Sequence, residues 1–336
     1  MKPNLKKTLK YLLSASLAII LLWFSFRGVE WNQFWLALGE VNWGFILLSM
    51  VAGSAAFLLR ALRWRRLLLP LDGSISRITA FNGINIANIS NFVFPRIGEF
   101  VRCGVIVRRS QPVDVSDPLK KKASYEKVLG TVVLERSWEL LVMLMLLAVV
   151  VVGGFDRYGS FFVNEIWRPM ALKFGGNMWF AVLGSLTVVG MSLFWLWRLR
   201  ESNSFCRKVW SIFRGIGQGF ATCMKMDQKW LFFAYTLLIW MMYWFMAAST
   251  MWAAPFLDGL NVVDALFLSL VGGLGFAIPV PGGIGAFHYV IALALLGVYG
   301  IPMEVGVIYA TLSHTSQAIT QILFGAGSYA YEALKK

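Results

Sequence analysis

The sequence predicts an all-α polytopic membrane protein with about six full transmembrane helices and two re-entrant half-helix hairpins. The first reason is composition, because 58% of the 336 residues are hydrophobic and only 14% are charged. With a mean hydropathy of +0.66, this is typical of a helical membrane protein. The second reason is that long apolar runs recur, without the alternating ten-residue pattern of a membrane barrel. The third is that two further apolar stretches are interrupted by proline and polar residues.

Six apolar runs are about as long as the hydrocarbon core of a bilayer requires. They cover approximately residues 11–26, 44–59, 128–152, 178–197, 230–252 and 305–331. The first run follows four lysines and resembles a signal peptide, but no small-residue cleavage site precedes Arg27. We therefore expect an uncleaved first helix and a single transmembrane domain over residues 1–336.

Basic residues are concentrated on one side of the predicted membrane. If the N-terminus is cytoplasmic, 24 of the 31 lysines and arginines fall in cytoplasmic segments and four in outer loops. This positive-inside distribution predicts a bacterial inner membrane protein with both the N- and C-terminus in the cytoplasm. It also accounts for the net charge of +14 without a nucleic-acid partner, and it suits anionic headgroups at the inner leaflet.

The first interrupted stretch covers residues 82–109. Four asparagines recur every three residues along one side of its first helix: Asn82, Asn85, Asn88 and Asn91. Pro95 then ends that helix, and three charged residues follow, namely Arg96, Glu99 and Arg102. Irregular backbone and charge at membrane depth are tolerated only inside protein or along a watery cavity, which indicates a substrate path. A soluble helix-turn-helix is the alternative, and the apolar surroundings disfavour it.

The second interrupted stretch breaks between Pro279 and Gly285, and its string PGGIGAF is similar to PRIGEF at the first break. Each half of the chain, about residues 10–152 and 178–332, then has two spans, one broken hairpin and one span. The first half starts inside and the second outside, so the two hairpins enter from opposite faces. This arrangement predicts an inverted repeat with a site near the midplane.

Charged residues near the first break are candidates for binding an anionic headgroup. Arg96 and Arg102 suit bidentate contact with phosphate, and a half-helix N-terminus favours the same ligand. The alternative is a Glu99–Arg102 ion pair that only locks the hairpin. The third span carries a second group, Glu135, Arg136 and Glu139, which either joins the site or pairs with those same arginines.

Other polar residues fit either a site or packing. Asn85 and Asn88 could line a path or make interhelical hydrogen bonds. His314 and Gln317 share a face of the last span, where the histidine is either proton-linked or a hydrogen-bonded packing residue. The remaining candidates follow the second break, where glycine permits a sharp turn or close approach of a ligand: Gly282, Gly283 and His288. Three cysteines and two histidines lack metal spacing, so we expect no metal, cofactor or disulfide framework.

Several of these motifs together resemble a known family. They are RALRW at Arg60, Asn85 and Asn88 before Pro95-x-x-Gly98-Glu99, Glu135-Arg136, and PGGIG from Pro281. The set is similar to the flippase-like membrane domain of lysylphosphatidylglycerol synthases (multiple peptide resistance factor) and its stand-alone relatives, over about residues 10–332. The resemblance implies translocation of a lipid between leaflets.

Two departures from that family limit what the resemblance implies. The sequence contains no aminoacyl-transferase domain, so synthase activity does not follow. His288 replaces an acidic residue that we expect after the glycine-rich turn, so the headgroup preference of the family does not carry over, and Glu139 stands where the family often has Asp.

The sequence therefore favours a lipid translocase, either a flippase or a scramblase, that moves an anionic or lipid-linked substrate. An enzyme acting on a lipid-linked substrate is the first alternative, although we find no nucleophile–base pair and no nucleotide-binding loop. An ion-coupled transporter of a small solute is the second. The identity of the lipid, the energy source and a homo-oligomeric state are left open.

Reporter fusions test the predicted topology. We expect fusions at three outer positions to report the extracellular side: Gly39, Asn164 and Gly259. We expect fusions at three other positions to report the cytoplasm: Lys121, Ser204 and Lys336. A cytoplasmic signal at Gly259 would contradict the inverted repeat, because both hairpins would then enter from the same face.

Overall fold

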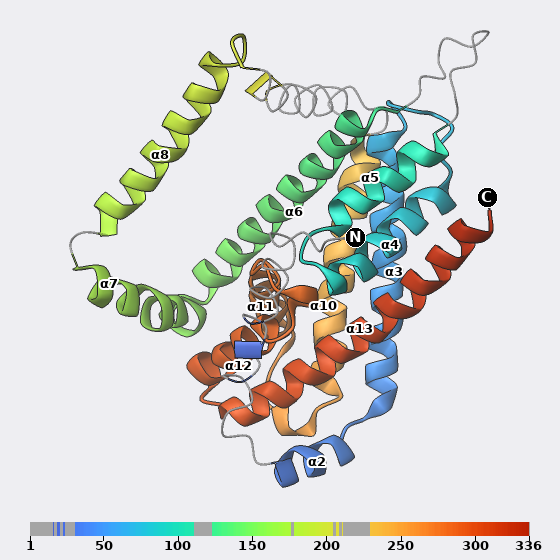
Figure 1. Cartoon of the computed structure of the whole chain (residues 1–336). Helices are drawn as coiled ribbons and strands as arrows, with labels where there is room; N and C mark the ends of the chain where they lie inside the picture. The colour runs from blue at the N-terminus through green and yellow to red at the C-terminus, as the bar shows by residue number, and fades with distance from the viewer. Residues whose placement is uncertain are drawn as a thin grey trace.

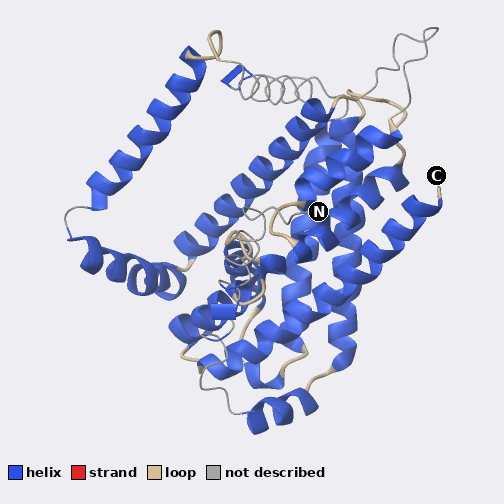
Figure 2. Ribbon diagram, in the orientation of Figure 1, coloured by secondary structure: helices blue, strands red, loops and turns tan. Residues whose placement is uncertain are grey.

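The computed structural model describes residues 31–110, 123–175, 178–203 and 229–335, together with 16, 19, 20, 23, 206, 207 and 210. Every regular element in these ranges is a helix (Figure 2). Most of the predicted first span, residues 11–26, lies outside the described residues. The chain is therefore confirmed as helical where it is described.

Residues 31–153, as far as the structure describes them, form five helices. They are α2 (Trp31–Gly39), α3 (Trp43–Leu68), α4 (Arg77–Val93), α5 (Gly98–Arg109) and α6 (Tyr125–Gly153). The helices that follow are η1 (Phe155–Gly159), η2 (Phe162–Trp167), α7 (Arg168–Phe174), α8 (Met178–Arg198), α10 (Lys229–Trp252), η4 (Pro255–Leu257), α11 (Val262–Gly275), η5 (Pro281–Gly283), α12 (Ala286–Tyr299) and α13 (Met303–Leu334). Figure 1 shows α8 at a distance from α6, with α7 between them.

Four segments of the described chain are long and apolar enough to cross a membrane. They are α3, α6, α10 and the segment Pro281–Tyr299 that contains α12. Helices α8 and α13 also coincide with predicted spans. The predicted spans therefore correspond to helices wherever the structure describes them.

The structure corrects three sequence-based boundaries. The second span was expected to end near residue 59, but α3 continues to Leu68, because leucine and arginine favour helix and the buried arginines find carboxylate partners. Arg60 and Arg63 consequently lie inside the bundle, not in a cytoplasmic segment. The expected loops near residues 31–39 and 155–174 are helical instead.

Helices α3 and α10 pack side by side in opposite directions (Figure 1). Near the start of α3, Ser49 Oγ donates to the Met246 carbonyl at 3.1 Å. Near its end, Arg63 Nη1 donates to Thr236 Oγ1 at 3.3 Å. Small residues on α3, such as Ala52 and Ala56, are buried and permit close approach of the two backbones.

Two broken hairpins, α4–α5 and α11–α12, pack against these helices. Each break contains a residue in the left-handed region directly after a proline, namely Arg96 after Pro95 and Gly282 after Pro281, both with φ of 60°. A left-handed residue cannot continue a right-handed helix, so the chain reverses there. Arg96 is the one residue other than glycine with positive φ in the described chain.

The tips of the two hairpins contact each other. Arg96 Nη2 donates to the Ala277 carbonyl at 2.8 Å, which joins the first tip to the end of α11. The Phe92 ring lies against Gly282 so closely that a Cβ there would collide with it. The predicted breaks are thus confirmed, and their contact is a tertiary feature.

The close approach within the first hairpin can be tested at Gly98. A Cβ at this position would collide with the Ala87 carbonyl and the Asn91 side chain, whose Oδ1 accepts from Gly98 N at 2.8 Å. We expect Gly98→Ala to lower the free energy of unfolding by about 1–3 kcal/mol. Gly104→Ala in the same helix is the matched control, since no atom lies within 4 Å of its Cβ position. Thermal unfolding in detergent gives the comparison, and equal effects would contradict the packing.

Candidate functional site

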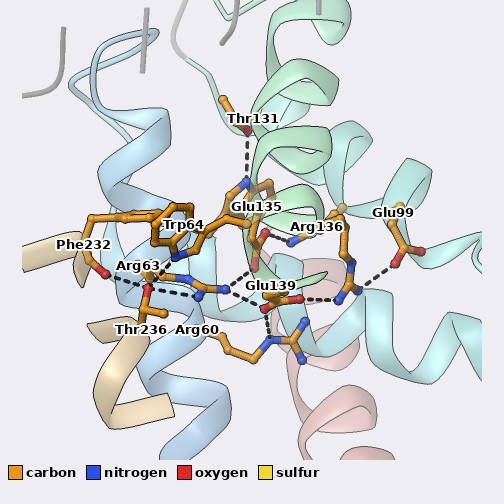
Figure 3. A network of polar contacts seen from close by, with 12 residues as sticks. Arg60, Arg63, Trp64, Glu99, Thr131, Glu135, Arg136, Glu139, Phe232 and Thr236 are labelled. Carbon is orange, nitrogen blue, oxygen red and sulfur yellow. Dashed lines mark hydrogen bonds and ion pairs between the residues drawn. The ribbon is translucent and has the colours of Figure 1, made fainter. Parts of the chain in front are cut away.

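Three helices bring seven charged side chains into one cluster of ion pairs, of which all but Arg102 are labelled in Figure 3. A spacing of three or four residues places Arg60 beside Arg63, Glu99 beside Arg102, and Glu139 one turn after both Glu135 and Arg136. They are Arg60 and Arg63 on α3, Glu99 and Arg102 on α5, and Glu135, Arg136 and Glu139 on α6. We call this set the charge cluster.

The centre of the charge cluster is Glu135, which uses both carboxylate oxygens. Its Oε2 lies 2.6 Å from Arg102 Nη1 and its Oε1 lies 3.5 Å from Arg63 Nη2. All three side chains are at most 1% exposed. A carboxylate buried to this degree needs cationic partners, so Glu135 ties α6 to α3 and α5.

The edge of the charge cluster is more open. Arg136 bridges two carboxylates, with Nη1 at 2.8 Å from Glu139 Oε2 and Nη2 at 2.7 Å from Glu99 Oε1. Its side chain is 41% exposed, against 19% for Glu99 and 16% for Glu139. Glu139 also accepts from Arg63 at 2.5 Å and pairs more loosely with Arg60 at 3.7 Å. The cluster therefore reaches the protein surface at Arg136.

Neutral side chains position the buried arginines. The Arg102 guanidinium lies 4.6 Å from the Trp64 ring centre, a cation–π distance. Trp64 Nε1 in turn donates to Thr131 Oγ1 at 3.0 Å. Thr236 on α10 accepts from Arg63 and from Trp138, which connects the fourth helix to the cluster.

The charges of the cluster do not balance. Four arginines meet three glutamates, which leaves one excess positive charge. Several donors also lack a hydrogen-bond partner among the described residues, namely Arg60 Nε, Arg63 Nε and Arg102 Nε and Nη2. These unused donors belong to buried arginines, whereas an anion at the open edge would meet the excess positive charge of the cluster through Arg136.

The structure separates the arginines that the sequence grouped. Arg102 is 1% exposed and pairs with Glu135, so the Glu99–Arg102 ion pair considered above is wrong, because Glu99 pairs with Arg136. Arg96 is bonded to the Ala277 carbonyl at the hairpin tip. The pairing of Glu135 with Arg102 is confirmed.

Sequence reasoning counted both Arg60 and Arg63 in a cytoplasmic segment and included neither among the candidate site residues. Their spacing of three residues, directly after an apolar run, was the available signal. Two glutamates inside the α6 span required cationic partners, and helical continuation of α3 supplies them.

The four asparagines of α4 have separate roles. Asn82 Nδ2 donates to Glu332 at 2.8 Å, and Asn91 accepts from Gly98 at 2.8 Å. Asn85 and Asn88 are buried. The Asn85 amide and Asn88 Nδ2 have no hydrogen-bond partner among the described residues. Buried polar groups in this state are rare in proteins.

The remaining candidates gather at the second hairpin tip and α13. His314 Nε2 lies 2.9 Å from the Gly282 carbonyl oxygen, and its ring centre is 5.0 Å from that of His288. A Cβ on Gly283 would collide with Phe276, so this glycine serves close packing. Gln317 Nε2 donates to Ser49 at 3.3 Å, while its Oε1 has no partner among the described residues.

The described residues contain no cluster of potential metal ligands. No group of three or more His, Cys, Asp or Glu side chains that could hold a metal ion occurs there.

Comparison with known proteins identifies the family of this chain. The family model of the lysylphosphatidylglycerol synthase TM region matches residues 9–325. The chain belongs to this family. No curated protein and no solved structure matches it. Membership in a transmembrane-region family, together with the apolar helices, makes this a multi-pass membrane protein, and it places the charge cluster among membrane helices.

The pairing at the centre of the cluster predicts a large loss of stability for Arg102→Gln. This change leaves the buried Glu135 with one distant cation, which should lower the free energy of unfolding by about 3–5 kcal/mol. Adding Glu135→Gln should recover part of that loss. Arg200→Gln is the control, because Arg200 pairs with an exposed Glu201 at 3.6 Å and should cost about 0–1 kcal/mol. Similar thermal unfolding of both single variants would contradict the pairing.

Proposed function

We propose that this family member is a lipid translocase, a flippase or scramblase, that moves an anionic or lipid-linked substrate between the leaflets of the inner membrane. The observation that carries the proposal is the charge cluster, which combines an excess positive charge among membrane helices with an edge open at Arg136. A charge at that depth is costly unless it serves a partner or a substrate. A lipid phosphate supplies the missing negative charge.

The proposal includes an inverted repeat, and the packing of the helices supports it. In one half the order is α3, the α4–α5 hairpin and α6; in the other it is α10, the α11–α12 hairpin and α13. α3 packs on α10, α4 packs on α13, and α11 packs on α6. When the two halves are interchanged, the α3–α10 contact maps onto itself and the α4–α13 contact maps onto the α11–α6 contact, as two-fold symmetry requires.

The topology that we propose follows from this symmetry. It has six full spans, two re-entrant hairpins that enter from opposite faces, and repeat halves at about residues 10–152 and 178–332. Both termini lie in the cytoplasm. The midplane site would then lie where the two tips meet, beside the charge cluster.

Within this site we assign the headgroup to the open edge of the cluster. Arg136 is accessible there, and Arg60 has only a 3.7 Å ion pair. Arg102 pairs with Glu135 at the buried centre of the cluster, and Arg96 connects the tip of the first hairpin to the end of α11. The side-chain atoms without a hydrogen-bond partner among the described residues, namely the Asn85 amide, Asn88 Nδ2 and Gln317 Oε1, offer further polar groups along the path. His288, His314, Gly282 and Gly283 shape the second tip.

A liposome assay tests the proposal. Purified protein should accelerate exchange of labelled phosphatidylglycerol between leaflets. Arg136→Gln should slow this by about tenfold or more, since a charge-assisted contact is worth about 1.5–3 kcal/mol. Arg136→Lys should keep part of the rate, and Arg200→Gln should keep all of it.

Two results would contradict the proposal. One is the absence of protein-dependent exchange for any lipid in a panel of headgroups, with folding verified by thermal unfolding. The other is a new lipid species in mass spectra of the same liposomes that disappears in Glu135→Gln, because covalent change identifies an enzyme.

A further inference from the structure

A carboxylate joins three elements at the open end of the second hairpin. Asp264, at the start of α11, is fully buried. Its Oδ1 accepts from Tyr158 at 2.7 Å and from Tyr299 at 2.9 Å. Its Oδ2 accepts from Asn261 N at 2.7 Å and lies 3.5 Å from Arg157 Nη2. We call this group the Asp264 latch.

The Asp264 latch connects both arms of its hairpin to the other half of the chain. Asp264 belongs to α11, and Tyr299 is the last residue of α12. Arg157 and Tyr158 belong to η1, directly after α6. Burial and the hydrogen bond to Asp264 raise the pKa of Tyr158 to about 12, so this hydroxyl remains a donor at neutral pH.

A second carboxylate connects three helices at the open end of the first hairpin. Glu332, near the end of α13, accepts from Asn82 Nδ2 at 2.8 Å and from Arg109 Nε at 2.7 Å. Arg109 Nη1 also donates to the Lys335 carbonyl at 2.9 Å. Asn82 is in α4 and Arg109 ends α5. We call this group the Glu332 latch.

The two latches have the same plan. Each uses both oxygens of one carboxylate and one arginine, and each ties the two arms of a hairpin to the end of a long helix, α13, or to the segment directly after one, η1 after α6. In the topology proposed above they lie on opposite faces of the membrane. Their partners are partly accessible to water, with side-chain exposures of 43% for Arg157 and 22% for Arg109. Water can therefore replace the bonds of these two arginines more easily than those of the buried arginines around Glu135.

We propose that the Asp264 and Glu332 latches are the outer and inner gates of the translocase. Release of one latch lets that hairpin separate from the long helix of the other half and opens one face, while the other latch keeps the opposite face closed. This inference rests on the proposed function, and it concerns control of access, not the headgroup site. The structure has both latches closed.

Thiol accessibility tests the gates separately. Cys103 on α5 and Ala294 on α12 are both fully buried, six and five residues before the end of their helices. For the inner gate, Cys103 is the reporter in a background with Cys206→Ser and Cys223→Ser. For the outer gate, Ala294→Cys is the reporter with all three native cysteines changed to serine. A membrane-impermeant maleimide is applied to inside-out or right-side-out vesicles, respectively.

For each gate, one variant removes the latch side chains that lie outside the hairpin and leaves those of the hairpin in place. Glu332→Ala should raise the labelling rate of Cys103 about tenfold, the factor equivalent to about 1.4 kcal/mol, and leave the Ala294→Cys reporter unchanged. Arg157→Gln with Tyr158→Phe, which spares Asp264 and its cap on α11, should do the reverse. Glu126→Gln, at an exposed carboxylate of α6, is the control and should change neither reporter.

Two outcomes would overturn the gates. If either variant accelerates labelling of both reporters, the latches only contribute to overall stability. If neither variant changes its own reporter, the latches do not control access. These outcomes are separate from failure of the proposed function, because side-specific labelling without lipid exchange would retain the gates and reject the translocase.

Discussion

The rest of the structure depends on the neutralisation of Glu135. A carboxylate buried among membrane helices is stable only with cationic partners in contact, and Arg63 and Arg102 reach it from two different helices. This requirement fixes how far α3 extends, because Arg63 must remain helical to reach α6. It also fixes the face that α5 presents to the bundle. The ion pairs of the charge cluster thus hold α3, α5 and α6 together, independently of any role in binding.

The broken hairpins add a second constraint, since their backbone groups must be satisfied inside the protein. The first hairpin meets it locally, with Asn91 accepting from Gly98 at the break. Its α5 helix is held by Arg102 in its middle and by Arg109 at its end. The bond at the middle is buried and the one at the end is partly exposed, so motion of this hairpin is expected to begin at its open end.

In the mechanism that we propose, the cluster binds the substrate and the latches control access to it. The cluster supplies a fixed positive site with an accessible edge, and its buried centre resists movement. The latches consist of a few hydrogen bonds at helix ends, and the arginine of each is partly exposed to solvent. A translocase needs both properties, because the substrate must meet a constant site while the faces open in turn.

The sequence by itself determined the helical membrane class, the described spans and both breaks, because hydropathy and proline act locally along the chain. The break at Pro95 and that at Pro281 were found to within a few residues for this reason. It also marked Glu135, Arg136 and Glu139 as charges that need partners. Only the tertiary structure decided which partners these are, since Arg63 and Glu135 are 72 residues apart and their contact depends on how α3 and α6 pack. The same holds for the Glu332 latch, whose residues read singly as ordinary helix-end polar groups, because a carboxylate's partners are set by the packing of distant helices and not by its neighbours in the chain.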